Sequence, residues 1–414
     1  MDNKKRVKVV RISAEVNRGS IGRTAEQLGE LVQEQGWDSY IAYGRKQGIS
    51  KSRTIRIGNR MSIYWHVFIS RFFDMHGLGS YFATKKFIKE LDAIAPQIVH
   101  LHNLHGYYVN YYILFKYLKN KNIPVVWTHH DCWAFTGHCG FYSSVGCEKW
   151  KNKCEKCPLS KEYPASKFFD ISSFQFKKKK ELFTSLDKLY NVGVSKWMVN
   201  QLKESFFKDT HILQINNGID TDLFRPSPEG AQQVREKYNL GDKTVLIAVA
   251  VSWTERKGLG DYLKLRKLIS DDYLIVLVGT PRALIETLPP GITGIPRTDN
   301  IEELCYLYSA SSIVMNLADA ESFGKTTPEG LSCGIPSIVY NCTASPELVD
   351  DKTGIVVEKG NIEGVVDAID RIMSWDKDST KNACRQRAIQ NFSTKNNWPQ
   401  YITLYKSILD EDNR

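Results

Sequence analysis

The chain has 414 residues, of which 42% are hydrophobic and 25% are charged, as in ordinary water-soluble globular proteins. This length exceeds what one hydrophobic core usually supports, so we expect two domains. The sequence contains no run of eighteen apolar residues, and its N-terminus lacks the long apolar segment of a signal peptide. These features exclude a membrane-spanning protein and predict a cytoplasmic one.

The net charge of +10 is unevenly distributed. Residues 1–225 carry 35 Lys and Arg against 20 Asp and Glu, a net +15, whereas residues 226–414 carry 21 against 26, a net −5. This asymmetry indicates that the first half faces an anionic partner. The candidates are an anionic membrane surface, a phosphate-bearing lipid acceptor and nucleic acid, and a plain solvated surface is the alternative.

In the first half, short apolar runs alternate with helical patterns. Val7–Ile12 predicts a strand, and Thr24–Gln35 predicts an amphipathic helix. Further strands are predicted at Ser39–Tyr43, Ile98–Leu101 and Val125–Thr128. Alternation of strands and helices is typical of a parallel sheet covered by helices on both faces.

The second half repeats this pattern. Val245–Val251 is a nearly continuous apolar run, as expected for a strand buried on both faces. Helices are predicted at Tyr262–Ile269 and Ile301–Ser309, and strands at Leu274–Val278, Ile313–Asn316 and Ser337–Tyr340. The fold class is therefore α/β, with two doubly wound domains in tandem.

The boundary between the domains is predicted at Asn216–Gly230, which is rich in Pro, Gly and turn residues. We predict an N-terminal Rossmann-like domain over residues 1–215 with a Cys-rich insertion at 132–160. A C-terminal Rossmann-like domain follows over residues 216–390. Residues 391–414 are predicted to form a helix that returns to the N-terminal domain.

The segment AESFGKTTPEGLSCGIP, which begins at Ala320, carries the most informative pattern. Gly324 and Pro328 predict a helix that begins just before Pro328, with that proline at its first position. Glu321 then lies in the loop before the helix, and Glu329 lies in its first turn. Backbone amides at a helix N-terminus bind anions such as a diphosphate, and the two carboxylates would accept hydroxyl hydrogen bonds from sugars. A capped helix with two surface glutamates is the alternative.

This segment resembles the E-x7-E motif of retaining glycosyltransferases of family 4, which have the GT-B fold. The spacing matches, as do the FG after the first Glu and the CG-x-P after the second. Other matches to the family's motifs, in chain order, are Pro96–Gly106, Val125–Asp131, Ile215–Pro226 and Val251–Gly258. The resemblance covers nearly the whole chain, and the Cys-rich stretch is similar to a subgroup that assembles exopolysaccharides of the colanic-acid type.

The resemblance implies two Rossmann-like domains that face each other across a cleft, and an enzyme of the hexosyltransferase type. It implies transfer of a sugar from a UDP- or GDP-sugar to a carbohydrate or lipid-linked oligosaccharide, with retention of configuration, in capsule or exopolysaccharide biosynthesis. No cofactor is expected for catalysis. A nucleotide-sugar epimerase of the same architecture is the alternative function. No nucleic-acid-binding signature is present, so nucleic acid is not an expected partner.

The resemblance also assigns roles to single residues of the second half. Glu329 matches the residue that binds the ribose hydroxyls of the donor, Glu321 matches a catalytic residue beside the donor sugar, and Lys257 matches the partner of the diphosphate. Ser252 stands where the family has an Arg, and Arg256 is the candidate that supplies the missing charge. The other predicted donor-binding residues are Phe323, Gly324, Lys325 and Thr326.

In the first half, His130 matches a catalytic His near the reaction centre, although its neighbours His129 and Asp131 complicate the choice. A Gly-rich loop after the first strand is expected to line the cleft on the donor side, because glycine lets the backbone approach a ligand closely. Its candidate residues are Gly19, Ser20 and Gly22. A polar group after the strand Ile98–Leu101 is expected to line the cleft or to contact the acceptor, and the alternative is that it only fills a loop. Its members are His100, His102, Asn103 and His105.

Four of the nine cysteines resemble a zinc knuckle with loose spacing: Cys139, Cys147, Cys154 and Cys157. Four thiolates would hold a structural zinc ion and stabilise a long loop, with Cys132 or His138 as substitute ligands. Free thiols and a disulfide are the alternatives.

Residues 59–91 are aromatic and basic, and Lys167–Lys180 mixes apolar and basic residues in the manner of interfacial segments. They predict peripheral binding to the inner face of the cell membrane, with an exposed charged helix as the alternative.

Overall fold

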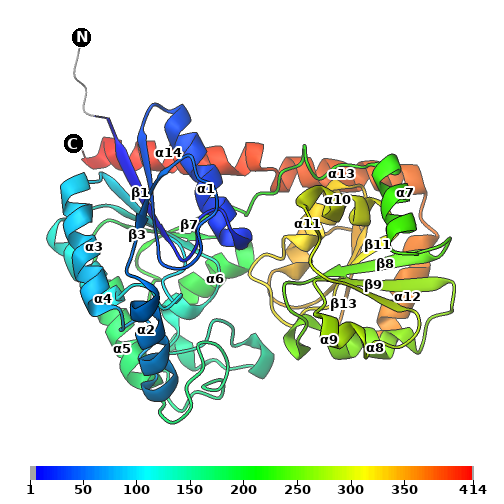
Figure 1. Cartoon of the computed structure of the whole chain (residues 1–414), viewed down its shortest axis with the longest axis horizontal. Helices are drawn as coiled ribbons and strands as arrows, with labels where there is room; N and C mark the ends of the chain where they lie inside the picture. The colour runs from blue at the N-terminus through cyan, green and yellow to red at the C-terminus, as the bar shows by residue number, and fades with distance from the viewer. Residues whose placement is uncertain (1–5, 413–414) are drawn as a thin grey trace. The chain divides into compact units, whose positions relative to one another are not determined.

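The computed structural model describes residues 6–412, which form two compact units. The N-terminal unit contains the chain up to Ile215 together with the segment from Trp398 on, and the C-terminal unit is Asn216–Asn397. Each unit is built around one parallel sheet with helices on both faces (Figure 1). The predicted fold class of two doubly wound α/β domains is confirmed.

The N-terminal unit has a seven-stranded parallel sheet. In sheet order the strands are β3 (Arg53–Arg56), β2 (Asp38–Tyr43), β1 (Lys8–Ser13), β4 (Ile98–Leu101), β5 (Val125–His129), β6 (Leu189–Gly193) and β7 (His211–Gln214). The helices are α1 (Gly19–Glu34), α2 (Arg60–Phe73), α3 (Tyr81–Ile94), α4 (Tyr111–Asn120), α5 (Ser172–Phe183), α6 (Lys196–Glu204) and, from Trp398 on, the C-terminal α14 (Thr394–Asp412). The strand order reverses between β1 and β4, which lie side by side in the middle of the sheet.

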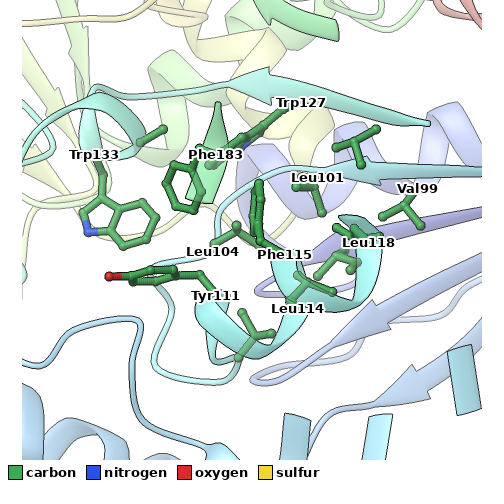
Figure 2. Close-up of a cluster of buried hydrophobic side chains, with 14 of the residues drawn as sticks. Val99, Leu101, Leu104, Tyr111, Leu114, Phe115, Leu118, Trp127, Trp133 and Phe183 are labelled. Atoms are coloured by element: carbon green, nitrogen blue, oxygen red, sulfur yellow. The ribbon is translucent and has the colours of Figure 1, made fainter. Parts of the chain in front are cut away.

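Helices bury apolar side chains on both faces of this sheet. On one face, Phe115 of α4 and Phe183 of α5 pack with ring centroids 4.3 Å apart, and Trp127 of β5 closes the cluster (Figure 2). On the other face, Tyr401 and Tyr405 of α14 pack among residues of α1 and β1. Burial of an aromatic side chain stabilises a fold by roughly 1.5–3 kcal/mol, so these rings fix the helices to the sheet.

The C-terminal unit has a six-stranded parallel sheet. In sheet order the strands are β10 (Ile292–Ile295), β9 (Tyr273–Val278), β8 (Thr244–Val249), β11 (Ile313–Asn316), β12 (Ser337–Tyr340) and β13 (Gly354–Val357). The helices are α7 (Pro228–Lys237), α8 (Leu259–Arg266), α9 (Arg282–Ile285), α10 (Ile301–Ser309), α11 (Thr326–Ser332), α12 (Ile362–Met373) and α13 (Lys377–Phe392). Here the strand order reverses between β8 and β11.

Two predicted helix positions need correction. Helix α1 begins at Gly19, five residues before the predicted start, because the chain already turns into the helix at the Gly-rich stretch after the extended Arg18. Helix α8 begins at Leu259 rather than Tyr262, since Gly258 adopts the left-handed conformation just before it. Among the described residues, the helices fall short of the length and apolar character that crossing a bilayer requires.

Candidate active site

The C-terminal candidate site lies where the strand order of the sheet reverses. Open parallel sheets bind ligands at the carboxyl ends of their strands, at such a switch point. Strands β8 and β11 are neighbours there, and their carboxyl ends lead into the loops that carry Lys257 and Glu321. The sequence therefore brings these two predicted site residues together through the topology of the sheet.

Several contacts join the two loops. The Lys257 ammonium forms an ion pair with the Glu321 carboxylate, and both side chains are about one-fifth exposed. The Arg256 guanidinium donates to the carbonyl of Ala320 at 3.0 Å, and the Asp319 amide donates to the carbonyl of Arg256 at 2.9 Å. Two cations and a carboxylate thus lie within one short stretch of polar surface.

Glycine makes the close approach of these loops possible. Gly258 has φ = +76°, and a Cβ atom there would lie 2.2 Å from the carbonyl oxygen of Leu317. Any side chain at this position would push the loop after β8, and Lys257 with it, away from the loop after β11. Ser252, where the family has an Arg, is exposed, whereas Arg256 contacts the residue next to Glu321.

The turn that leads into α11 is fixed on both sides of Glu321. The Glu321 amide donates to Thr343 Oγ1 at 2.9 Å, and the same hydroxyl donates to the Glu321 carbonyl at 2.8 Å. Phe323 is buried, and Gly324 has φ = +85°, a conformation that side chains rarely adopt. Lys325 and Thr326 follow at the start of α11, and both are partly exposed.

Helix α11 carries Glu329 in its first turn, as predicted, and Glu321 lies in the preceding loop. The predicted position of Pro328 is wrong: the helix begins at Thr326, so Pro328 is its third residue. Proline is tolerated there because first-turn amides have no acceptor within the helix. The buried Tyr308 donates its hydroxyl to Glu329 Oε2 at 3.1 Å and orients the carboxylate. Sequence reasoning did not find Tyr308 or Thr343.

The N-terminal candidate site lies at the equivalent position of its own sheet, after β1 and β4. Gly19 and Ser20 are exposed in the first turn of α1, and Gly19 has φ = +63°. Gly22 is buried, and a Cβ atom there would come within 3.1 Å of the Glu15 carbonyl oxygen. These three residues lie at the start of the helix rather than in the predicted loop.

The side chains of the two adjacent histidines at the end of β5 lie in different environments. His129 is buried between Trp127 and Phe207 and bonds Asn191 Oδ1 at 2.8 Å, and burial lowers its pKa to about 4. His130 is partly exposed, and its Nε2 lies 3.1 Å from Nδ1 of His102. The structure therefore separates a core histidine from a histidine at the polar surface, a choice that the sequence left open.

A small pocket at the ends of β4 and β5 gathers most of the predicted polar group. It is lined by His102, Asn103, His105, His130 and Asp131, among others. His105 Nε2 lies 2.7 Å from Asp131 Oδ2. Burial works to raise the pKa of the Asp131 carboxyl, yet the neighbouring His105 holds it below its ordinary value. The pocket thus places a carboxylate and imidazole groups side by side.

His100 does not belong to this pocket. It is fully buried, and its two ring nitrogens bond the hydroxyls of Tyr405 and Thr128 at 2.6 and 2.8 Å. It is part of the core that holds α14 against the sheet, so the expectation of a ligand contact fails here. The four cysteines of the predicted zinc site lie elsewhere in the N-terminal unit, around a cavity of their own.

Each unit therefore carries charged and polar side chains at the switch point of a parallel sheet, and two such units in tandem define a GT-B glycosyltransferase fold. A solved glycosyltransferase structure from Rickettsia africae has this fold, with a TM-score of 0.68 and 18% identity over 98% of this chain and 99% of that chain. The family model described as Glycosyltransferase Family 4 matches residues 21–223, and the model described as Glycosyl transferases group 1 matches residues 243–374. The chain belongs to the glycosyltransferases of family 4, which confirms the resemblance.

Curated relatives match parts of the chain. The Escherichia coli K12 protein assigned to colanic acid biosynthesis as glycosyl transferase WcaC is 28% identical over 225 residues, which are 51% of this chain and 54% of that protein. The GDP-mannose-dependent alpha-(1-6)-phosphatidylinositol monomannoside mannosyltransferase of Mycolicibacterium smegmatis is 24% identical over 201 residues, 44% of this chain and 52% of that protein. The matches thus span about half the length of these relatives.

Proposed function

We propose that this protein transfers a hexose from a nucleotide-diphosphate sugar to a carbohydrate or lipid-linked saccharide, with retention of configuration. One observation carries the proposal: Lys257, Arg256 and Glu321 gather at the switch point of the C-terminal sheet, beside the helix that presents Glu329. This charge pattern suits a donor with an anionic diphosphate between a sugar and a ribose.

In this proposal the donor binds to the C-terminal unit. Glu329 accepts hydrogen bonds from the ribose hydroxyls, while Lys257 and Arg256 face the diphosphate. The remaining donor contacts come from the turn formed by Phe323, Gly324, Lys325 and Thr326. The diphosphate gains negative charge as the glycosidic bond breaks, so cations placed there stabilise the transition state more than the ground state.

The acceptor binds to the pocket of the N-terminal unit. His130 lines this pocket and is proposed to contact the donor sugar near the anomeric carbon, with Gly19, Ser20 and Gly22 close to the donor. We infer that the departing phosphate takes the proton of the attacking hydroxyl on the same face of the sugar. Catalysis then requires no cofactor.

The donor is tested by thermal shift and by turnover. GDP, UDP and ADP are added separately, and the nucleotide that binds the native state raises the melting temperature. The mannosyltransferase relative named above makes GDP-mannose the first donor to assay. Release of nucleoside diphosphate that requires a saccharide acceptor supports the proposal. Conversion of the donor to an isomer without any acceptor would instead indicate an epimerase.

We also propose that the enzyme binds an anionic membrane through an exposed aromatic patch of the N-terminal unit. The patch consists of Trp65, Phe68, Phe72, Phe73, Phe168 and Phe169, from α2 and the loop before α5. Its rings form a connected set, with centroids 4.6 Å apart for Phe68 and Phe72 and 5.5 Å apart for Phe72 and Phe168. Phe168 is 70% and Trp65 is 60% exposed, so these rings are available to a partner.

Charge complementarity favours an anionic bilayer as that partner. The exposed Arg71 and Lys167 lie within the patch: the Lys167 amide donates to the Arg71 carbonyl at 2.7 Å, and its ammonium lies 5.8 Å from the Phe72 ring centroid. Aromatic rings flanked by cations enter the headgroup region of anionic membranes. A lipid-linked acceptor would be found on the same surface.

Vesicle flotation tests this docking. The wild-type protein is expected to float with vesicles that contain phosphatidylglycerol, but not with pure phosphatidylcholine vesicles. The double variant Phe68→Ser/Phe168→Ser should lower the partition coefficient by at least about tenfold. The reason is that two rings that become buried in the bilayer contribute several kcal/mol to the free energy of membrane binding. Ile49→Ser, at a residue that is 90% exposed outside the patch, is the matched control. Equal flotation of the double variant and the control would refute the docking surface.

A further inference from the structure

A cavity lined by cysteines lies in the irregular segment between β5 and α5. Within residues 130–171, all of which the structure describes, regular structure is limited to three short 3-10 turns at Trp133–Phe135, Ser143–Val145 and Lys149–Lys151. Cys139, Cys147, Cys154 and Cys157 line the same cavity, and all four are free thiols. An irregular segment of this length within a compact fold needs a local source of stability.

A backbone amide is directed at one of these sulfurs. The Gly137 amide donates to Cys154 Sγ at 3.2 Å. An amide donor stabilises the thiolate form of cysteine, which is the form that binds a metal ion.

A buried cation lies beside the cavity. Lys179 of α5 is fully buried, and its ammonium donates to the carbonyls of Trp133 and Thr136 at 2.8 and 3.1 Å. The same ammonium lies 3.5 Å from the centroid of the Trp133 ring, and within residues 6–412 no carboxylate forms an ion pair with it within 4.0 Å. A buried charge is costly unless a counter-charge lies near it, so this position favours an anionic group at the thiols.

A second group of potential ligands lies nearby, but its hydrogen bonds disfavour metal binding. Asp74, His76 and His138 bring their ligand atoms within 4.8 Å of one another. However, the indole N–H of Trp133 donates to His76 Nδ1 at 2.9 Å, so neutral His76 carries its proton on Nε2, the nitrogen that faces Asp74. His138 Nδ1 lies 2.7 Å from Asp74 Oδ1. This group is a buried hydrogen-bond network in which His76 has no free lone pair for a metal.

We propose that Cys139, Cys147, Cys154 and Cys157 bind one structural Zn²⁺ ion. Four thiolates around Zn²⁺ carry a net charge of −2, which Lys179 partly balances. Tetrahedral zinc has Zn–S bonds of about 2.3 Å, so binding draws the four sulfurs to within about 3.8 Å of one another and fixes the segment. Metal binding releases the thiol protons, and no redox step is involved.

The site has a consequence for the acceptor pocket. The Cys132 amide donates to the Gly140 carbonyl at 2.8 Å, and the Thr136 hydroxyl donates to the Cys139 carbonyl at 2.6 Å. Through these bonds the zinc ligand Cys139 supports the segment that contributes Asp131 and Trp133 to the pocket. Zinc therefore acts as a positioning element for the pocket and takes no part in the transfer reaction.

Metal analysis of the full-length protein tests the site. Protein purified without chelator from zinc-supplemented cells is expected to contain about one zinc per chain. Cys157→Ser and Cys139→Ser should bring the content below about half an equivalent. Cys342→Ser, at a partly exposed thiol of the C-terminal unit, should leave it unchanged.

Two measurements on the wild-type protein test the site independently of whether the variants fold. Titration of wild-type protein with a mercurial reagent should release zinc, detected by a colorimetric chelator, as the cluster thiols react. Replacement by Co²⁺ should give the intense visible absorption of a tetrahedral thiolate centre. Metal-free wild-type protein, or a disulfide between two of the four cysteines by intact mass, would overturn the assignment.

Discussion

Replacement of Glu329 should weaken donor binding by a calculable amount. A carboxylate that accepts hydrogen bonds from two ribose hydroxyls gains about 1.5–3 kcal/mol from each bond. Glu329→Ala removes both bonds, a loss of about 3–6 kcal/mol, which corresponds to a 10²- to 10⁴-fold rise in the Kd of the donor. Because Glu329 is partly exposed, water competes for the same carboxylate and we expect the lower end of this range.

Two further variants separate charge from geometry at this position. Glu329→Gln keeps the shape but accepts only neutral hydrogen bonds, so the Kd should rise by about ten- to 100-fold. Tyr308→Phe removes the 3.1 Å bond that orients the carboxylate and should cost less than about tenfold. Calorimetric titration with the nucleoside diphosphate measures these values, and Glu302→Ala, at an exposed residue of α10, is the control. A Kd for Glu329→Ala within tenfold of wild type would refute the role of Glu329.

Three other predictions concern the loops and the two adjacent histidines at the end of β5, His129 and His130. Gly258→Ala should destabilise the protein by about 2–5 kcal/mol in urea unfolding, since it adds a clash with Leu317 to the strain of φ = +76°. Gly360→Ala has the same φ, but nothing lies within 4 Å of its new Cβ, so it should cost only about 1–2 kcal/mol; equal losses would contradict the close approach of the loops. His129 has a folded pKa of about 4, below its unfolded value, so stability is lost as the pH falls below about 6.5. The loss is about 2 kcal/mol at pH 5, and His129→Gln should remove that part of the pH dependence of unfolding. His130→Ala should lower kcat by more than about tenfold with little change in the donor KM, and a change confined to KM would contradict its proposed place near the anomeric carbon.

The strands that sequence reasoning found are largely buried, although β6, which is buried at all five residues, was missed. Ile98–Leu101, Ile313–Asn316 and Ser337–Tyr340 coincide with β4, β11 and β12. Such strands are runs of apolar residues that stand out between polar loops. The missed strands include β3 and β7, which lie at the two edges of the N-terminal sheet and expose both of their end residues. Their mixed composition gave no periodic signal that separates them from loops.

The candidate site was predictable only in part for a related reason. The E-x7-E segment predicts that Glu321 lies in the loop before the helix and Glu329 in its first turn, because a Gly and a Pro limit where the helix can begin. It does not predict the partner of each carboxylate. Tyr308 reaches Glu329 from α10, and Thr343 holds the backbone of Glu321 from the loop after β12. These contacts depend on how the helices pack on the sheet, and a single sequence carries no information about that packing.

The net charge of the C-terminal unit does not by itself favour the proposed donor site. Residues 216–397 carry 20 Lys and Arg against 25 Asp and Glu, a net −5, which by itself would repel a diphosphate. The Lys257–Glu321 pair and Arg256 nevertheless place two cations at the switch point, where the field of nearby groups outweighs that of distant surface carboxylates because salt screens the latter beyond about 8 Å. In the proposed donor site, an incoming diphosphate would compete with Glu321 for Lys257. Release of Glu321 from this pair would then leave its carboxylate available to the donor sugar, so the same ion pair would couple donor binding to the positioning of Glu321.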